Sequence, residues 1–234
     1  MGGIDNHVAS AFCSITVVPV GCDPNQASST AVAAVPGGFN TNPSGFIGGG
    51  QIGYNYQMGW FVWGVETDFS GADISGSNSK TLTATVFDIP ANIPVVNTIT
   101  GTANQKLDWL GTLRGRVGVV PFTALLVYAT GGLAYGHVSA DLTLSQACSC
   151  GPSSTASASI SSTQWGWTAG GGVEWMFAPH WSVKAEFLYY NLGHVSANMT
   201  LTQLSGGTPL TTIGITSTVD AKGDIARGGI NYRF

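Results

Sequence analysis

Three glycines in the stretch GFIGGGQIGYNYQ, residues 45–57, have a spacing that could bind a dinucleotide. Gly48, Gly50 and Gly53 match the pattern G-x-G-x-x-G, in which glycines let the backbone approach a pyrophosphate at a helix N-terminus. Such a site needs an apolar-periodic helix directly after the last glycine, but the residues that follow read YNYQMGWFVWGVETDF. Gly59 follows only six residues after Gly53, and apolar and polar residues then alternate as in a strand. Because no helix begins here, the sequence predicts no cofactor at these glycines.

Two histidines could take part in hydrolysis of a lipid ester. His137 is followed by Ser139 and Asp141, and His194 is followed by Ser196, so each could contribute to a Ser–His–acid group. Polar residues are also common at strand ends without any catalytic role. We therefore expect the protein not to be an enzyme, and an outer-membrane lipid-modifying enzyme is the less favoured alternative.

The four cysteines lie in Ser-, Thr-, Gly- and Pro-rich surroundings. Cys13 with Cys22 is the more plausible disulfide, because Cys148 with Cys150 would close a strained small ring, and pairing between the two regions stays open. No C-x-x-C pair occurs and no histidine lies at ligand spacing, so neither a metal site nor a cofactor is predicted.

The composition argues against an ordinary soluble domain. Only 9% of the 234 residues are charged, against roughly 25% in typical soluble domains, whereas 33 are glycine and 10% are aromatic. The net charge of −4, with no basic cluster, argues against nucleic acid as a partner. No run of about 18 apolar residues appears, so the membrane option that remains is a β-barrel.

Apolar and polar residues alternate with a period of two in seven separate runs. In residues 60–70, for example, Phe61, Trp63 and Val65 face one way, and Glu66 and Asp68 face the other. Each run has the length that a tilted strand needs to cross a bilayer, with lipid outside and a polar lumen inside. The runs are residues 45–57, 60–70, 107–119, 125–136, 164–177, 181–192 and 223–234.

The connections between the runs alternate in length. Short turns follow the first, third and fifth runs, whereas residues 71–106, 137–163 and 193–222 are long and polar. This asymmetry is typical of outer-membrane barrels, which have short periplasmic turns and long extracellular loops. The pattern predicts an all-β, transmembrane, antiparallel up-and-down β-barrel in the bacterial outer membrane.

Ten charged residues take inward positions in these runs, and five of them are acidic and five basic. In a narrow lumen such groups must pair, because an unpaired buried charge costs several kcal/mol. We expect a structural plug of ion pairs, while a lining for a narrow porin is the alternative and a proton-handling site a further one. The residues are Glu66, Asp68, Asp108, Arg114, Arg116, Glu174, Lys184, Glu186, Arg227 and Arg233.

Several motifs together resemble a known family. GFIGGGQIGYNYQ, FVWGVETDFSGA, WLGTLRGRVGVV, LLVYATGGLAYG, WTAGGGVEW, WSVKAEFLYYNLG and the final ARGGINYRF are similar to the porin-like outer-membrane β-barrel family of alphaproteobacteria. That family is related in fold to the membrane domain of outer membrane protein A. The resemblance covers residues 45–234 apart from the long connections, and implies an eight-stranded barrel.

The resemblance also implies a signal for the barrel-assembly machinery in the last strand. Carried over to this chain, the signal comprises Gly228, Ile230, Tyr232 and Phe234, and its alternative is an amphipathic strand that simply ends at Phe234. The family's usual first strand, of the type W-T-G-F-Y-x-G, and a signal peptide are not recognisable. We expect residues 1–44 to hold the outer end of that first strand, near residues 1–7, and the first extracellular loop; a poorer option is that residues 8–20 supply the strand.

The favoured function is that of a non-enzymatic outer-membrane barrel with a structural and surface role. Its expected partners are outer-membrane lipids and, during biogenesis, the assembly machinery. A soluble ligand-binding barrel is disfavoured, because it would carry apolar residues inside and polar residues outside. The oligomeric state is not readable from the sequence.

Overall fold

The chain folds as antiparallel β-structure throughout the part that the structure describes. The computed structural model describes residues 2–3, 6–15, 41–87, 94–122, 124–148, 154–205 and 208–234. Within those residues every regular element is a strand, and no helix is long and apolar enough to cross a membrane. The predicted all-β class is confirmed.

Seven long strands follow one another up and down in chain order. Their pairing path runs from β3 through β4, β5, β6, β7 and β8 to β9, and the two short strands β1 and β2 both pair with β9. All these pairs are antiparallel, as short turns between consecutive strands require. The strands are β1 (Gly2–Gly3), β2 (Asn6–Ile15), β3 (Ser44–Met58), β4 (Phe61–Phe87), β5 (Pro94–Phe122), β6 (Leu125–Cys148), β7 (Ser154–Ala178), β8 (Trp181–Ser205) and β9 (Thr208–Tyr232).

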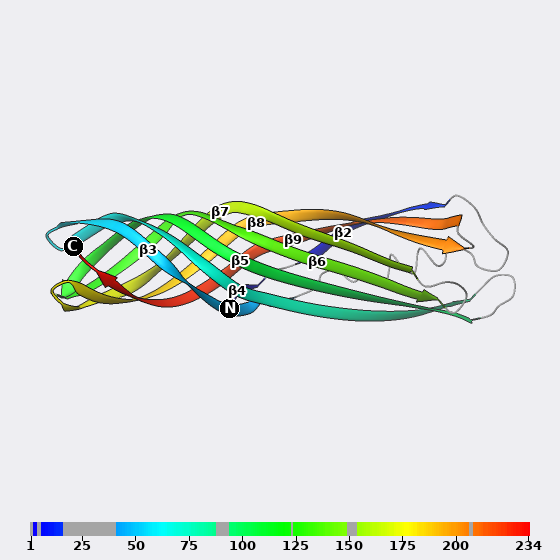
Figure 1. The fold of residues 1–234 in the computed structure, drawn as a ribbon, viewed down its shortest axis with the longest axis horizontal. Coiled ribbons are helices and arrows are strands. Elements are labelled where there is room, and N and C mark those ends of the chain that lie inside the picture. The colour runs from blue at the N-terminus through cyan, green and yellow to red at the C-terminus, as the bar shows by residue number, and fades with distance from the viewer. Residues whose placement is uncertain are drawn as a thin grey trace.

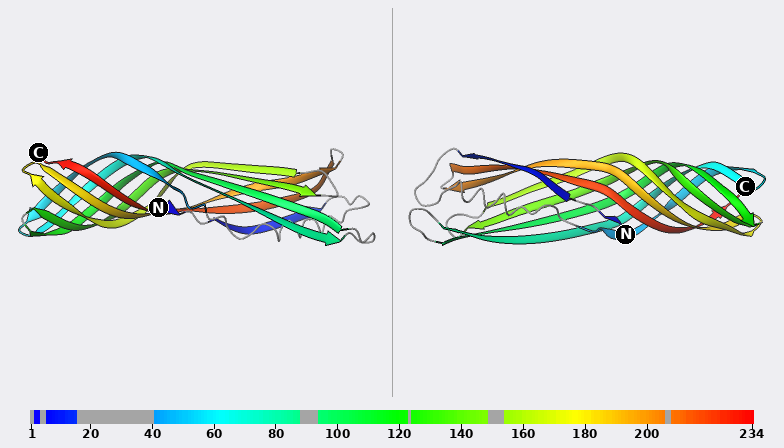
Figure 2. Two further views of the ribbon diagram at one scale, coloured as in Figure 1. Left: turned by 90° about the horizontal axis from the view of Figure 1, so that it is seen from below. Right: turned by 180° about the vertical axis from the view of Figure 1, so that it is seen from behind.

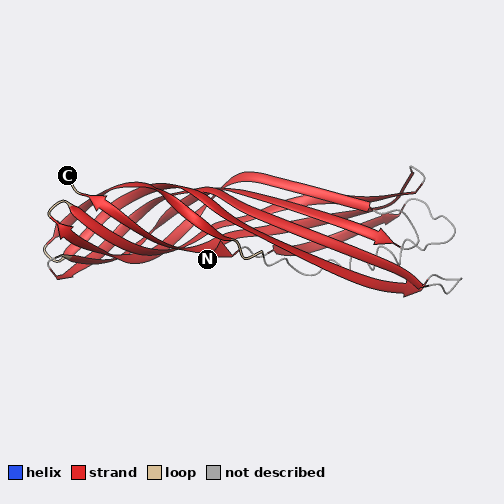
Figure 3. Ribbon diagram, turned by 60° about the horizontal axis from the view of Figure 1, so that its bottom comes forward, coloured by secondary structure: helices blue, strands red, loops and turns tan. Residues whose placement is uncertain are grey.

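The long strands twist around one another in one half of the molecule and continue far beyond it in the other (Figure 1). The C-terminus lies at the end with the short turns, and the N-terminus lies near the middle of the long axis (Figures 1 and 2). We call the half with the short turns the barrel half; it holds β3 and residues 61–71, 109–122, 125–136, 167–178, 181–191 and 223–232. The remaining parts of β4 to β9, together with β2, form the distal half (Figure 3).

The outer surface of the barrel half is apolar. Large side chains on alternate positions of each strand are exposed, such as Ile52 (75%), Leu113 (52%) and Phe187 (55%). A soluble protein would bury these residues, so their exposure around a whole ring of strands indicates a lipid-facing band. The charged residues near the short turns take inner positions, as the alternation predicts, whereas the inner positions nearer the distal half are apolar, such as Leu110 and Leu188.

The distal half has the opposite polarity. Its inner face buries apolar side chains such as Ile99 and Leu144, together with two uncharged amides, Gln105 and Gln146. Its outer face carries hydroxyl ladders such as Thr81 with Thr100. The long connections that the sequence assigned to polar loops are therefore mostly strand. Their many Ser and Thr residues resemble loop composition, but in the structure those hydroxyls cover the solvent side of a sheet.

Bulges separate the two halves. In β5 the inner positions are odd up to Leu107 and even from Leu110 onward, and the pairing of β5 with β6 shifts between Leu107 and Trp109. In β8 the pairing with β9 shifts between Asn191 and His194. One extra residue exchanges the inner and outer sets of a strand, because side chains alternate with a period of two.

The N-terminal segment pairs with β9 in the distal half. β1 lies opposite Gly223 and Lys222, and β2 runs from there along residues 211–219 of β9. Residues 8–15, which we expected in the first loop, are thus strand, and the option that they complete the barrel half is wrong because they lie beside the distal part of β9. Of the described strands, none pairs with the edge of β3 that faces away from β4, or with the edge of residues 224–232 of β9 that faces away from β8, and the expected eighth strand stays a prediction.

Candidate functional site

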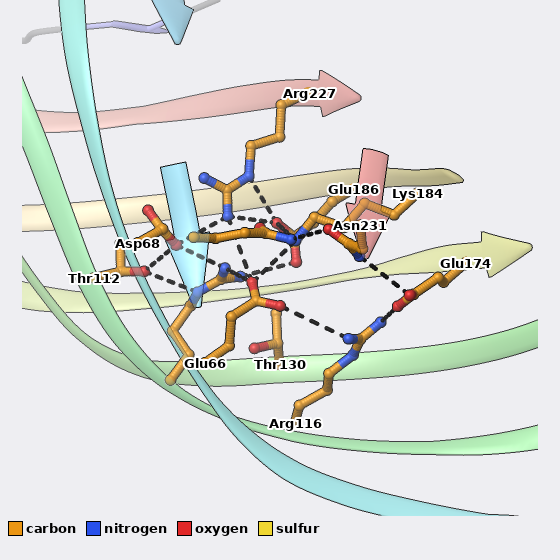
Figure 4. A network of polar contacts seen from close by, with 12 residues as sticks. Glu66, Asp68, Thr112, Arg116, Thr130, Glu174, Lys184, Glu186, Arg227 and Asn231 are labelled. Carbon is orange, nitrogen blue, oxygen red and sulfur yellow. Dashed lines mark hydrogen bonds and ion pairs between the residues drawn. The ribbon is translucent and has the colours of Figure 1, made fainter. Parts of the chain in front are cut away.

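Eight charged side chains meet inside the barrel half, and Figure 4 shows how those that it labels point toward one another. They come from five strands, and their alternating positions turn all of them into the lumen. Four are carboxylates and four are cations, so the formal charge of this ionic cluster is zero. They are Glu66 and Asp68 of β4, Arg114 and Arg116 of β5, Glu174 of β7, Lys184 and Glu186 of β8, and Arg227 of β9.

Arg114 is the centre of the ionic cluster. Its side chain is fully buried, and Nη2 lies 2.5 Å from Glu66 Oε1 and 2.8 Å from Asp68 Oδ2. Nη1 donates to Glu186 Oε1 over 2.9 Å. One guanidinium thus pairs with three carboxylates from two strands, which uses the several donors that only arginine offers in a planar fork.

Two further cations complete the neutralisation of these carboxylates. Lys184 Nζ lies 3.0 Å from Glu66 Oε1 and 3.7 Å from Glu186 Oε2. Arg227 reaches Asp68 Oδ2 over 3.0 Å and Glu186 Oε2 over 2.7 Å. Each buried carboxylate therefore faces more than one cation, the condition under which buried charge is tolerated.

Arg116 and Glu174 form a second part of the cluster, nearer the short turns. Arg116 Nη2 donates to Glu174 Oε2 over 2.5 Å, and the guanidinium carbon lies 3.6 Å from the centre of the Tyr128 ring. Gly172 leaves space for that ring, since a Cβ there would come within 2.7 Å of the Tyr128 hydroxyl. The cation thus gains an aromatic face as well as a carboxylate.

Neutral side chains complete the network, and the sequence analysis did not include them among the site residues. Thr112 Oγ1 donates to Asp68 over 2.6 Å and accepts from Arg114 Nε over 2.9 Å. Ser182 and Asn231 both donate to Glu174 Oε1. The signal that could have found them is their inward position on the same strands as the charges.

Two of the ten predicted charges lie elsewhere. Asp108 pairs with Lys106 over 2.9 Å outside the lumen, because the bulge between Leu107 and Trp109 turns it to the outer face. Arg233 follows the last residue of β9, is exposed, and uses its backbone N–H to donate to the carbonyl of His180. The inward position assigned to Asp108 is therefore wrong, and Arg233 lies outside the ionic cluster.

An apolar layer lies in the lumen between the ionic cluster and the distal half. It combines residues from β4, β5, β6, β8 and β9, and Leu188 and Leu192 are among its most buried members, at 1% exposure each. The sequence analysis missed this layer because it expected a polar lumen along the whole length of the strands. The layer comprises Ile74, Leu107, Leu110, Ala134, Val138, Leu188, Tyr190, Leu192, Ala221 and Ile225.

Aromatic side chains mark both ends of the apolar outer surface. At the distal end, Phe69, Trp109, Tyr135 and Trp165 contact one another in turn across β4 to β7, with ring centroids 5.1 to 5.9 Å apart. We call this row the outer girdle; rings of this kind are typical of the two membrane interfaces.

The predicted assembly signal lies at the opposite end of that surface. Ile230, Tyr232 and Phe234 are exposed on the outer face, and Gly228 is exposed with them. The Tyr232 ring lies 5.0 Å from Trp181 and 5.1 Å from Phe234, between centroids. The structure thus gathers these residues on one apolar edge beside the short turns.

His137 does not meet the partners that the sequence suggested. Its Nε2 lies 2.9 Å from Ser161 Oγ and its Nδ1 lies 3.4 Å from Thr163 Oγ1, both on the neighbouring strand β7. Ser139 instead donates to Asp108. Among the described residues, none of these contacts brings a carboxylate to the second nitrogen of His137, which a Ser–His–acid group needs.

The remaining candidates give no site within the described residues. No group of three or more His, Cys, Asp or Glu side chains that could hold a metal ion occurs there. The predicted disulfide between Cys13 and Cys22 lies outside the described residues, since Cys22 is not among them and only the backbone of Cys13 is. Gly48 and Gly50 lie in the middle of β3, and no helix follows Gly53.

Comparison with known proteins gives a family and several relatives. The family model described as outer membrane protein beta-barrel domain matches residues 18–234. The 31 kDa outer-membrane immunogenic protein of Brucella melitensis is 36% identical over 160 residues, which cover 68% of this chain and 59% of that protein. The 22 kDa outer membrane protein of Rhizobium leguminosarum is 30% identical over 157 residues, which cover 65% and 56%.

These curated relatives are longer than the region they share with this chain, which spans less than two thirds of their length. Among solved structures, Ail, the attachment invasion locus protein of Yersinia pestis, overlaps with 96% of this chain and 99% of its own. The sequence identity is 13% and the TM-score 0.29.

Proposed function

Because the chain belongs to the family of outer membrane protein beta-barrel domains, we propose that it acts in the outer membrane as a non-enzymatic structural and surface barrel with a closed lumen. The observation that carries the proposal is the ionic cluster: eight charges that neutralise one another across five strands. In this view the cluster ties the strands of the barrel together and occupies the space through which a solute would pass.

The apolar layer supports a closed lumen independently of the ionic cluster. An ion that entered from the distal half would lose water among Leu188, Leu192 and their neighbours before it reached a polar group. Hydrophobic constrictions of this kind oppose conduction, because they cannot replace the hydration of an ion. The two barriers lie in series along one narrow lumen.

Conductance of the purified full chain in planar bilayers tests this proposal. We expect no steady channels at protein amounts at which a known porin, inserted in parallel, conducts. Insertion is verified by protection of the barrel half from added protease. Steady, reproducible channels from verified barrels would overturn the closed lumen.

A narrow porin for small solutes is the second candidate. The observation that favours it is Arg116 Nε, a buried donor for which no protein acceptor is found among the described residues. A buried donor in that position is commonly satisfied by water, and a chain of waters would begin a pore. Under this alternative Arg116→Met changes the conductance or ion selectivity of the channel, whereas a closed barrel has no conductance to change.

We also propose that the exposed edge formed by Ile230, Tyr232 and Phe234 is read by the barrel-assembly machinery. Its support is the gathering of these side chains beside the short turns, where the last strand ends. Deletion of Phe234 is expected to lower the amount of heat-modifiable, folded protein in the outer membrane, and Arg233→Ala serves as the control. Equal folded amounts in both variants would refute this role.

A further inference from the structure

Among the described strands, none pairs with the distal part of β7 on the side away from β6. The pairing of β7 with β8 begins beside the short turns and ends at Trp167 opposite Asn191. Beyond that point β7 pairs only with β6, from Gln164 opposite Gly136 to Ser154 opposite Gln146. Gly166 still lies against Asn191 of β8, but the backbone groups of residues 154–165 that point away from β6 face no described strand. We call the row of residues 154–166 the β7 edge.

The separation has a local cause in β8. Gly193 has a φ of 81°, a conformation that residues with a side chain rarely adopt, and its N–H donates to Asn191 Oδ1 over 2.8 Å. The register of β8 against β9 shifts at the same place. Such a bulge bends its strand, so β8 stays with β9 and leaves β7.

Within residues 154–166 the β7 edge has none of the charged residues, prolines or bulges that often protect an exposed strand. Residues 154–166 read STASASISSTQWG, with no charged residue and no proline. Their pairing with β6 has no register shift, so no bulge twists the edge away. Proteins usually guard such edges with lysine, proline or a bulge, because an open row of N–H and C=O groups pairs with any available strand.

The side chains along the β7 edge alternate in a way that selects a partner. Ala156 is buried on the inner face, and Ala158 and Ile160 on that face are only half-buried because β8 has moved away. Ser157 and Ser159 are exposed on the outer face. A strand added here would cover the inner apolar residues with its own apolar side chains and turn polar ones to solvent.

We propose that the β7 edge binds an extended peptide segment of another protein, which joins the sheet as an additional strand. The backbone hydrogen bonds would supply affinity, and the alternation of apolar and hydroxyl-bearing side chains would determine which peptide sequences bind best. Except for its last two residues, Trp165 of the outer girdle and Gly166, the edge lies beyond that girdle in the distal half, so it is accessible from outside the membrane. The inference does not depend on whether the lumen conducts.

Symmetry excludes a second copy in the same membrane as the added strand. Two copies with the same orientation are related by an axis along the membrane normal, so their β7 strands would run parallel and present the same edge to each other. In a parallel pair, a residue that faces the partner strand bonds to the two residues on either side of the one opposite it. Two identical edges at the same height would set N–H against N–H and C=O against C=O, so they cannot form this ladder. The partner is therefore a segment of another protein, which can run in either direction along β7.

The test uses the full chain in detergent and a synthetic peptide of alternating valine and threonine with a lysine at each end, long enough to span residues 154–166. Fluorescence anisotropy measures binding, and hydrogen exchange measures protection of the backbone. We expect saturable binding and new protection confined to amides of the β7 edge. The control peptide is N-methylated at every amide and is expected not to bind.

Two matched lysine variants separate edge pairing from charge. Ile160→Lys places an inward charge against the incoming strand and is expected to weaken binding about tenfold. Ser159→Lys adds the same charge to the outer face and is expected to change binding by less than about twofold. Heat-modifiable migration verifies the fold of each variant, and Ala158→Lys replaces the first if it does not fold.

Three results would overturn the proposal. The first is absence of binding, or protection outside residues 154–166. The second is slow exchange of the β7 edge before any peptide is added, which would show that another part of the chain already covers it. The third is a concentration-dependent dimer that Ile160→Lys abolishes, which would assign the edge to a second copy.

Discussion

The barrel half and the distal half are built from the same strands but have opposite insides. In the barrel half the lumen holds Arg114 and its carboxylates while Leu113 faces outward; in the distal half Ile99 faces inward while Thr100 faces outward. Both halves keep the period of two. The difference shows that β alternation fixes only that two faces exist, and the solvent on each side decides which face is polar.

Among the substitutions that test the difference between the two halves, the largest loss of stability is expected at the centre of the ionic cluster. Arg114→Met removes a cation from Glu66, Asp68 and Glu186 and leaves buried negative charge, which should cost about 3–5 kcal/mol of unfolding free energy. Urea unfolding of the barrel in lipid vesicles measures the loss. The control Lys106→Met removes an exposed pair and should change nothing measurable; equal effects of both variants would contradict a special role of the lumen.

A substitution in the apolar layer should lower the unfolding free energy almost as much. Leu188→Ala deletes a fully buried side chain between the two halves and should cost about 2–5 kcal/mol, depending on how far the cavity collapses. The same unfolding experiment applies, with Val183→Ala, on the lipid-facing side of β8, as the comparison. A smaller loss for Leu188 than for Val183 would mean that the layer is not packed.

The same substitution on one strand separates the two outer surfaces. Leu113→Arg places a charge on the lipid side of β5 and should cost about 2–4 kcal/mol. Thr100→Arg places it on the outer face of the distal half, where water surrounds it, and should stay within about 0.5 kcal/mol. Comparable losses at both positions would remove the distinction between a lipid-facing and a water-facing half.

The smallest expected effect tests one hydrogen bond that an uncharged side chain donates to the ionic cluster. Tyr128→Phe keeps the ring beneath Arg116 but removes the hydroxyl that lies 3.2 Å from Glu186 Oε1, which should cost about 1 kcal/mol. Tyr135→Phe, in the outer girdle, is the matched control and should lie close to the original protein. A loss above that of Leu188→Ala would show that the hydroxyl has a larger role than one hydrogen bond.

The barrel half was predictable because its strands obey one rule. Composition excluded a soluble surface, and alternation placed Glu66, Arg114 and Lys184 on one side of their strands without any knowledge of the fold. Their pairing partners were not predictable, since the register between strands decides which inward charges meet. Thr112 and Asn231 were overlooked for the same reason: only the register brings them to a carboxylate.

The distal half was not predictable, because two local features hid the alternation of apolar and polar residues along its strands. Its strands are rich in Ser and Thr, the composition of loops, and its inner face uses small residues such as Ala103 and Ala156 that carry little hydrophobic signal. The bulge after Leu107 also inverted the alternation, so that Asp108 was assigned to the wrong face. A one-residue irregularity of this kind has no signature in a single sequence.

The contact of Arg227 with Asp68 has a consequence for how the molecule folds. These residues lie 159 positions apart in the chain, and both also contact Glu186 or its partner Arg114. Without Arg227 the other seven charges of the ionic cluster sum to −1, so the cluster reaches a formal charge of zero only when the last strand has arrived. The loop that the contact with Asp68 closes is among the longest the chain allows. Charge neutrality in the lumen is thus reached at the end of assembly, which makes an incomplete barrel electrically distinct from a finished one.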